Sequence, residues 1–207
     1  MAIGVAKLVG FTGDGVVVCY IKHMHLLLVP GRGDKYAMFR QLAKLWRHLG
    51  FDARMWEFDW QRDDGDFAGR FDELLRHIDS LPERVCIIGA SAGGTVAVNA
   101  LLTRPSKVVR VATISAPLAR DFGRNTVLSR SFAHMQSALE RAQYLLGRVC
   151  TTAGYRDNVV PPVYSKLPGS LARRVPGWSH NSSIVLALTL YALPIARWLK
   201  RASAPEM

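Results

Sequence analysis

A glycine-rich turn around one serine is the feature of this sequence with the clearest chemical meaning. The turn Gly-Ala-Ser-Ala-Gly-Gly over residues 89–94 follows an apolar run over 85–88 and precedes an apolar segment with helical spacing. Between a strand and a helix, such a Gly-x-Ser-x-Gly turn holds the serine in a tight corner, so its neighbours must be small. The hydroxyl of Ser91 would lie at a helix N-terminus, where the amide of Ala92 can stabilise an oxyanion. Ser91 is therefore a candidate nucleophile.

Two other interpretations of the turn stay open. Glycine-rich turns also serve close packing, and some of them bind nucleotide phosphates. The turn has neither the Gly-x-Gly-x-x-Gly order nor the Gly-Lys-Ser/Thr ending of phosphate-binding loops. The phosphate interpretation is therefore weaker than that of a nucleophile.

A serine nucleophile needs a general base, and the base needs a carboxylate that orients it and stabilises its charged form. His180 follows the last predicted strand, over 171–175, and stands just before the last apolar segment, and Asp157 follows a predicted strand that ends near residue 153. The chain order Ser91, Asp157, His180 is the order found with nucleophile turns of this kind. Asp121 follows the preceding apolar run and is the alternative carboxylate, although it could instead pair locally with Arg120 or Arg124.

The elements that must position these residues alternate along the chain. Apolar and β-branched runs predict strands over residues 16–21, 26–30, 54–58, 84–89, 108–114, 148–153 and 171–175. Helical spacing predicts helices over residues 36–49, 66–80, 95–103 and 128–146, and a final helix capped by Ser182 or Ser183. Such alternation predicts an α/β fold, with a mostly parallel twisted sheet and helices on both faces. Its ligand site is expected at the carboxyl ends of the strands.

Together these features resemble the α/β-hydrolase superfamily, in particular its small, nearly lidless serine hydrolases and esterases. The resemblance covers nearly the whole chain and rests on the Pro30-Gly31 turn, the Ser91 turn, the Asp157-x-x-Val160-Pro161 segment and the His180 loop. It implies one α/β-hydrolase domain over residues 1–207, with a small cap segment at most over 117–147. It also implies a second oxyanion donor, the amide of Arg32, although Pro30-Gly31 stands where relatives commonly have His-Gly.

The resemblance implies a carboxylesterase-like serine hydrolase that cleaves a small or medium acyl ester through an acyl-enzyme intermediate. A thioesterase, a lactonase and a non-catalytic binding protein of the same fold are the alternatives. Gly31, Leu128, Phe132 and Met135 are the candidate substrate-binding residues. The helical face of the last three could instead pack on the sheet. No cofactor or metal is expected, and the partner is a small acyl substrate.

Composition and charge limit the other classes of function. The chain has 207 residues, of which 49% are apolar, which argues against disorder, collagen-like repeats and coiled coils. Its 27 Lys and Arg against 16 Asp and Glu leave a net charge of +11. No basic cluster accompanies a nucleic-acid motif, so a solvated basic surface is expected and no specific nucleic acid. Contact with a membrane surface is an alternative, because Arg197, Trp198, Lys200 and Arg201 end the last helix.

The remaining reactive residues predict structural roles. Cys19, Cys86 and Cys150 are widely spaced within predicted strands, which favours free core thiols and a cytoplasmic location. His23 and His25 lack a third ligand for a metal site, and the acidic run over 63–66 lacks the pattern of a calcium loop. The N-terminus has no pattern of a secretory signal. The longest apolar stretch, over 184–196, is shorter than the roughly 20 residues that span a bilayer.

Overall fold

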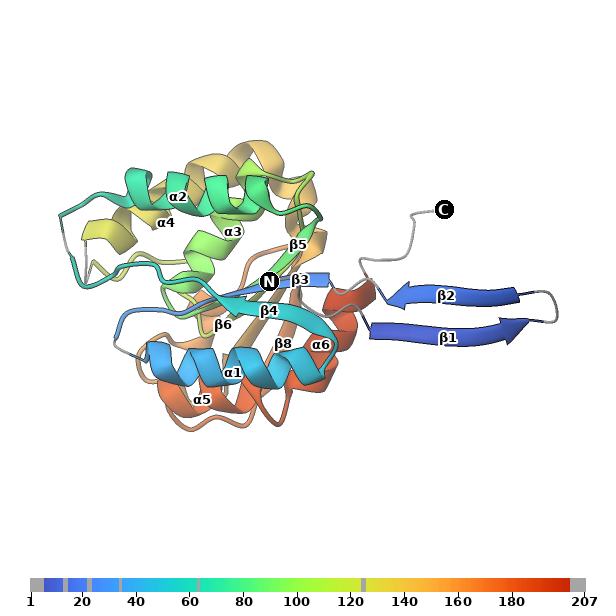
Figure 1. The fold of residues 1–207 in the computed structure, drawn as a ribbon. Coiled ribbons are helices and arrows are strands. Elements are labelled where there is room, and N and C mark those ends of the chain that lie inside the picture. Colours follow the sequence, from blue (N-terminus) through green and yellow to red (C-terminus); the bar gives the residue numbers. More distant parts are fainter. Residues whose placement is uncertain are drawn as a thin grey trace.

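The sheet that carries the site is parallel throughout. The computed structural model describes residues 6–12, 15–21, 24–33, 35–62, 64–123 and 126–201. From edge to edge, the strands are β4 (Phe51–Met55), β3 (Met24–Val29), β5 (Val85–Ala90), β6 (Val108–Ile114), β7 (Val149–Gly154) and β8 (Leu171–Val175). Because all six run in one direction, their carboxyl ends meet at one edge of the sheet (Figure 1).

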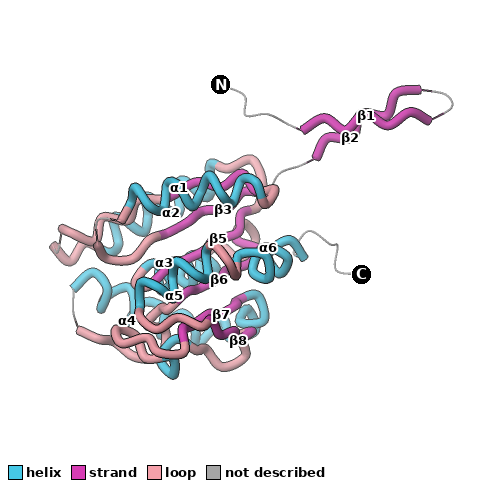
Figure 2. The backbone as a smooth tube through the Cα atoms, turned by 90° about the horizontal axis from the view of Figure 1, so that it is seen from below, coloured by secondary structure: helices cyan, strands magenta, loops and turns pink. Residues whose placement is uncertain are grey.

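Helices cover both faces of this sheet (Figures 1 and 2). One layer consists of α2 (Phe67–Ser80), α3 (Gly93–Thr103) and α4 (Thr126–Ala142), and the other of α1 (Tyr36–His48), α5 (His180–Leu188) and α6 (Ala192–Lys200). Short 3-10 helices, η1 (Gln143–Arg148) and η2 (Pro162–Ser165), follow α4 and precede β8. The predicted α/β class, with helices on both faces, is confirmed.

The core lies in two layers, one on each face of the sheet. Every residue of β5 and β7 is buried, as expected of central strands covered on both sides. In the layer of α1, the indole Nε1 of Trp46 donates a hydrogen bond to the carbonyl of Leu188, at 3.1 Å. This bond joins α1 to the end of α5 across 142 residues of sequence. Cys86 and Cys150 are free and buried within these strands, as predicted, and burial raises the pKa of the Cys86 thiol to about 12.

The N-terminal strands form a separate two-stranded sheet. The predicted strand over 16–21 is β2 (Gly15–Ile21), which pairs antiparallel with β1 (Ala6–Thr12). The sequence pattern does not predict β1, because Lys7 and Gly10 interrupt its apolar residues. The sequence left the pairing of β2 open, and the structure pairs it with β1 in this sheet, not with β3.

The prediction of a strand over 54–58 is wrong by three residues. β4 spans Phe51–Met55, and the following segment is a loop whose large side chains are nevertheless buried. Trp60 donates from its indole Nε1 to the carbonyl of Pro30 at 3.0 Å, and its ring lies 4.6 Å from that of Phe58. These loop aromatics fill the core beside the sheet, and they give the sequence the apolar pattern of a strand.

The final helix is broken and begins earlier than predicted. Ser179 is the N-cap of α5, and Ser182 closes a reciprocal capping box with it, so neither Ser182 nor Ser183 is the cap. The chain leaves the helix at Thr189 and resumes as α6, in whose first turn Pro194 lies. Proline fits a first turn but would clash with the carbonyl four residues earlier in a continuous helix, which explains the break.

The break between α5 and α6 also divides the longest apolar stretch of the chain, over 184–196. Over the described residues, no single helix has the length and apolar character to cross a bilayer. α5 and α6 reach that length only as a pair, and their axes differ by 57°.

Candidate active site

Ser91 occupies a strained corner between β5 and α3. Its φ is +51°, a left-handed conformation that is rare outside glycine and costs backbone energy. The Ser91 amide donates to the carbonyl of Ile114 at 2.8 Å, and the Ser91 carbonyl accepts from Gly94 at 2.9 Å. A side chain at Gly93 would clash with the carbonyl of Val29 on the neighbouring strand. The small residues of the turn are therefore needed to bring β3, β5 and α3 together at this corner.

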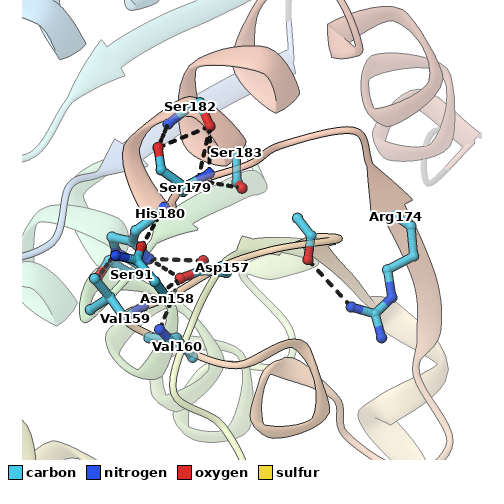
Figure 3. Close-up of polar contacts among 11 residues, drawn as sticks. Ser91, Asp157, Asn158, Val159, Val160, Arg174, Ser179, His180, Ser182 and Ser183 are labelled. Atoms are coloured by element: carbon cyan, nitrogen blue, oxygen red, sulfur yellow. Dashed lines mark hydrogen bonds and ion pairs between the residues drawn. The ribbon is translucent and has the colours of Figure 1, made fainter.

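His180 lies between the serine and an aspartate (Figure 3). Its Nε2 is 2.9 Å from the Ser91 Oγ, and its Nδ1 is 2.9 Å from Oδ2 and 3.0 Å from Oδ1 of Asp157. His180 is the first residue of α5, and the capping box of Ser179 and Ser182 fixes the start of that helix. The three residues singled out in the sequence therefore lie in one hydrogen-bonded line at the carboxyl edge of the sheet.

Asp157 is held by its own loop. Its side chain has no exposed surface, and its Oδ1 accepts hydrogen bonds from the amides of Val159 at 3.0 Å and Val160 at 2.9 Å. Burial would raise the pKa of Asp157, but the hydrogen bond from His180, the two amides and the His180 charge outweigh it and lower that pKa. The carboxylate is ionised at neutral pH and can only accept hydrogen bonds. His180 must therefore carry a proton on Nδ1, which leaves Nε2 of the neutral ring free to accept the serine proton.

Asp121 does not lie against His180. Its Oδ1 accepts from the amide of Gly123 at 2.9 Å and from the hydroxyl of Ser129 at 3.1 Å, and the residue is exposed. These contacts close a local turn after β6. Of the two candidate carboxylates, the structure brings only Asp157 into contact with the histidine.

The loop after β3 touches the serine corner. A Cβ atom on Gly31 would lie 3.0 Å from the amide nitrogen of Ala92, so this loop passes directly over the start of α3. Arg32 and Ala92, whose amides are the predicted oxyanion donors, both line the cavity in front of Ser91. Gly31 lines a second, smaller cavity that also contains Ser91 and His180.

The cavity in front of Ser91 has a volume of about 330 Å³. Its walls come from the loops after the strands and from the start of α4, and they comprise Arg32, Gly33, Gln61, Ser91, Ala92, Pro117, Phe122, Leu128, Val159, Val160 and His180. The sequence patterns do not point to Gln61, Pro117, Phe122 or Val159 as lining residues. All four follow β4, β6 or β7, and the rule that ligands bind in loops at the carboxyl ends of strands could have found them.

Of the three residues predicted on the inner face of α4, only Leu128 reaches this cavity. Met135 is fully buried in the core, and Phe132 is half-buried against the same core, so neither lines the cavity. The reason is that α4 packs beside α3. There the Ser131 hydroxyl lies 2.8 Å from that of Thr95, and Asn99 Nδ2 donates to the Ser131 carbonyl at 2.9 Å. Within 117–147, Pro117, Phe122 and Leu128 line the pocket, while the rest of α4 belongs to the helix layer.

The residues considered for metals have other partners. The Nδ1 of His25 is 3.0 Å from Oδ2 of Asp52. Asp66 is the N-cap of α2 and accepts from the amide of Gly69 at 2.8 Å. Asp64 bonds to Arg62 and Arg70. His23 and Asp63 lie outside the described residues.

Comparison with known proteins identifies the fold. No protein-family model matches the sequence, and no curated protein matches it. Among solved structures, it is similar to the monoacylglycerol lipase of Paleococcus ferrophilus, with a TM-score of 0.66 and 19% identity over 86% of this chain and 95% of that one. It is also similar to an α/β-hydrolase enzyme from the metagenome of Mar Chica lagoon sediments, with a TM-score of 0.65 and 16% identity over 95% of this chain and 100% of that one.

A third similar structure is a lipase of Bacillus licheniformis, with a TM-score of 0.62 and 18% identity over 92% of this chain and 98% of that one. The three structures match 86%, 95% and 92% of the chain. At such low identity, the likeness establishes architecture rather than activity. The chain has the α/β-hydrolase fold.

Proposed function

We propose that the protein is a serine hydrolase that cleaves carboxylic esters by two-step acyl transfer. The observation that carries the proposal is the position of His180, whose ring nitrogens lie 2.9 Å from the Ser91 hydroxyl and 2.9 Å from the Asp157 carboxylate. This geometry allows the histidine to take the serine proton while the aspartate stabilises the positive ring.

In the first step, the Ser91 Oγ attacks the ester carbonyl as its proton passes to Nε2 of His180. The carbonyl oxygen becomes an oxyanion, which the backbone amides of Ala92 and Arg32 stabilise as hydrogen-bond donors. The C–O bond to the leaving alcohol then breaks, and His180 returns the proton to that alcohol. The acyl group remains on Ser91.

In the second step, water attacks the acyl-enzyme. His180 takes a proton from the water, and the same two amides hold the second oxyanion. Collapse releases the carboxylic acid, and the proton on Nε2 returns to the Ser91 Oγ. Asp157 stays ionised throughout, since the three hydrogen bonds that it accepts lower its pKa.

The size of the cavity supports a small or medium acyl group. Its volume of about 330 Å³ lies at the lower end of the range for small-molecule sites. Leu128, Phe122, Val159 and Val160 supply apolar walls next to Ser91. The similar structures include enzymes described as lipases, which agrees with an ester substrate.

Covalent labelling tests the nucleophile directly. A fluorophosphonate probe is expected to label the protein once, and the Ser91→Ala variant should not be labelled. Ser115 supplies a control, because it is the other described non-glycine residue with positive φ, and its hydroxyl, unlike that of Ser91, lines neither cavity and is buried. Ser115→Ala should be labelled as the unchanged protein is. Labelling that survives Ser91→Ala would refute the proposal.

A series of p-nitrophenyl esters tests the substrate class. Turnover is expected for acetate and butyrate esters and should fall steeply for palmitate, which exceeds the cavity. If no ester in the series is hydrolysed although Ser91 is labelled, the nucleophile stands and the ester assignment fails.

A further inference from the structure

The helix layer of α1, α5 and α6 contains no acidic residue. The three helices carry Arg40, Lys44, Arg47, Arg197 and Lys200 but no Asp or Glu. On the opposite layer, α2 and α4 contain acidic residues in addition to basic ones: Asp72, Glu73, Asp79 and Glu140. The positive charge of the chain is therefore distributed unevenly between the two faces of the sheet.

We call the exposed surface of α1, α5 and α6, with the adjoining Arg201, the basic face. Two of its helices are joined beneath this surface, because Trp46 of α1 donates to the carbonyl of Leu188 at the end of α5. The Nζ of Lys200 on α6 lies 5.3 Å from the ring centre of Phe51, which is the first residue of β4 and lies two residues after the C-cap of α1. Seen from below, the three helices lie on the same face of the sheet (Figure 2).

Few carboxylates compete for the charges of this face. Glu57 pairs with Arg40, and Asp52 is occupied by His25 and Arg54 at the edge of the sheet. Within the described part of the chain, no carboxylate forms an ion pair with Lys44 or Arg197. The face therefore presents cations whose charge is not locally neutralised.

Large apolar side chains project from the same surface. Leu190, in the break between α5 and α6, is 77% exposed, and Leu193 in the first turn of α6 is 53% exposed. Leu45, Val185 and Tyr191 are exposed on the neighbouring turns. Exposed leucines at a helix break cost free energy in water, and beside basic residues they form the pattern of a surface that enters a lipid interface.

We propose that the basic face docks on an anionic lipid bilayer. The lysines and arginines would lie at the headgroups, and Leu190 and Leu193 would enter the boundary of the acyl chains. A nucleic acid would also attract the charges, but phosphate contacts give no role to protruding leucines. The combination favours a membrane over a polynucleotide.

The first turns of α1 and α5, two helices of the basic face, lie at the active-site edge of the sheet. A small cavity of about 50 Å³ is lined by Ser91 and His180 and also by Lys35 and Met38 near the start of α1 and by Ile184 and Val185 of α5. Ser91 therefore lies close to the first turns of both helices. Binding to lipid needs no hydrolysis, so its test is separate from that of the proposed function.

The test is co-sedimentation of the full chain with vesicles, without substrate. Vesicles of phosphatidylcholine and phosphatidylglycerol in equal amounts should bind the protein at low salt, whereas pure phosphatidylcholine should bind it far less. Because one basic residue near an anionic surface contributes roughly a fivefold gain in binding, the double variant Lys44→Gln/Arg197→Gln should lower the partition about 30-fold. Arg76→Gln/Arg141→Gln, on the opposite layer, has the same net charge and should lower it less than about threefold.

A second pair of variants tests the contribution of the exposed apolar side chains to lipid binding. Leu190→Ser/Leu193→Ser should lower the partition about tenfold or more, since each leucine loses the gain of leaving water. Tyr144→Ser/Val163→Ser changes two exposed apolar residues elsewhere and should leave binding unchanged. Absence of binding to the anionic vesicles, or equal losses in the paired variants, would overturn the proposal. Tighter binding to a DNA duplex that the leucine variants retain in full would replace it with a nucleic-acid surface.

Discussion

Gly31 and Ser91 approach so closely that a Cβ atom on Gly31 would lie 2.6 Å from the Cβ of Ser91. The same atom would lie 2.9 Å from the carbonyl oxygen of Ala90. The loop after β3 therefore fits over the serine corner only because residue 31 has no side chain. This contact sets the position of the next amide, that of Arg32, which we propose as an oxyanion donor.

The Gly31→Ala variant is expected to fold but to lose activity. The added methyl group must push the loop away from Ser91, and loss of one oxyanion donor typically lowers the rate about 100-fold or more. We expect kcat/KM for a short aryl ester to fall by about that factor, with fluorophosphonate labelling slowed in parallel. Gly147→Ala is the matched control, because a Cβ there meets no atom within 4 Å. Full activity in Gly31→Ala would contradict the assigned role of the loop.

Replacing each of the two candidate carboxylates by asparagine gives a second test. Asp157→Asn removes the acceptor that holds the proton on His180 Nδ1, so the ring can present the wrong tautomer to Ser91; a loss of about 10⁴ in kcat is expected. Asp121→Asn changes only a local turn, and kcat should stay within about twofold. Circular dichroism should show both variants folded. The opposite ranking of the two variants would move the acid to Asp121.

The sequence allows much of this site to be predicted because its signals are local. The small residues around Ser91 reflect a corner that only a tight turn can make, and the buried run of β5 is continuous because both of its faces are covered. The order of Asp157 and His180 after later strands then places them at the same edge of a parallel sheet.

The errors arise where a local pattern depends on a distant partner. Periodicity correctly puts Leu128 and Met135 on one face of α4, but the contact between Ser131 and Thr95 turns most of that face toward α3. Phe58 and Trp60 have the apolar pattern of a strand, yet the bond from Trp60 to Pro30 buries them in a loop. In both cases the deciding contact joins segments about 30 residues apart or more, and no pattern within one segment reveals it.

Two histidines in the α2–α4 layer should make stability depend on pH. Burial and then the charge of Arg141 lower the pKa of His134, while burial and the charges of Arg54 and His25 lower that of His77. The unfolded chain therefore takes up these protons at a higher pH than the folded chain. Their contribution to stability is complete above the ordinary histidine pKa of about 6.5 and is lost as the pH falls through the lowered values.

Urea unfolding at pH values from 8 down to about 5 measures this dependence. The free energy of unfolding should fall toward the acid end of this range. His134→Gln should make it fall less steeply. The variant also removes the contact of His134 Nδ1 with Asn99 Oδ1 at 2.8 Å. The slope, rather than the absolute stability, is therefore the readout. An acid slope unchanged by His134→Gln and by His77→Gln would show that other groups cause it.

Variants at Leu128 and Met135 distinguish a residue of α4 that shapes the pocket from one that packs in the core. Leu128 lines the cavity beside Ser91, so Leu128→Ala should enlarge it and shift the preferred acyl chain to a longer one. Met135 has no exposed surface, so Met135→Ala should destabilise the protein by about 2–5 kcal/mol through the cavity that it leaves. Its acyl preference should stay that of the unchanged protein. The measurement is the ratio of kcat/KM for butyrate and octanoate esters, together with urea unfolding. A change of acyl preference in Met135→Ala comparable to that in Leu128→Ala would mean that the inner face of α4 reaches the substrate after all.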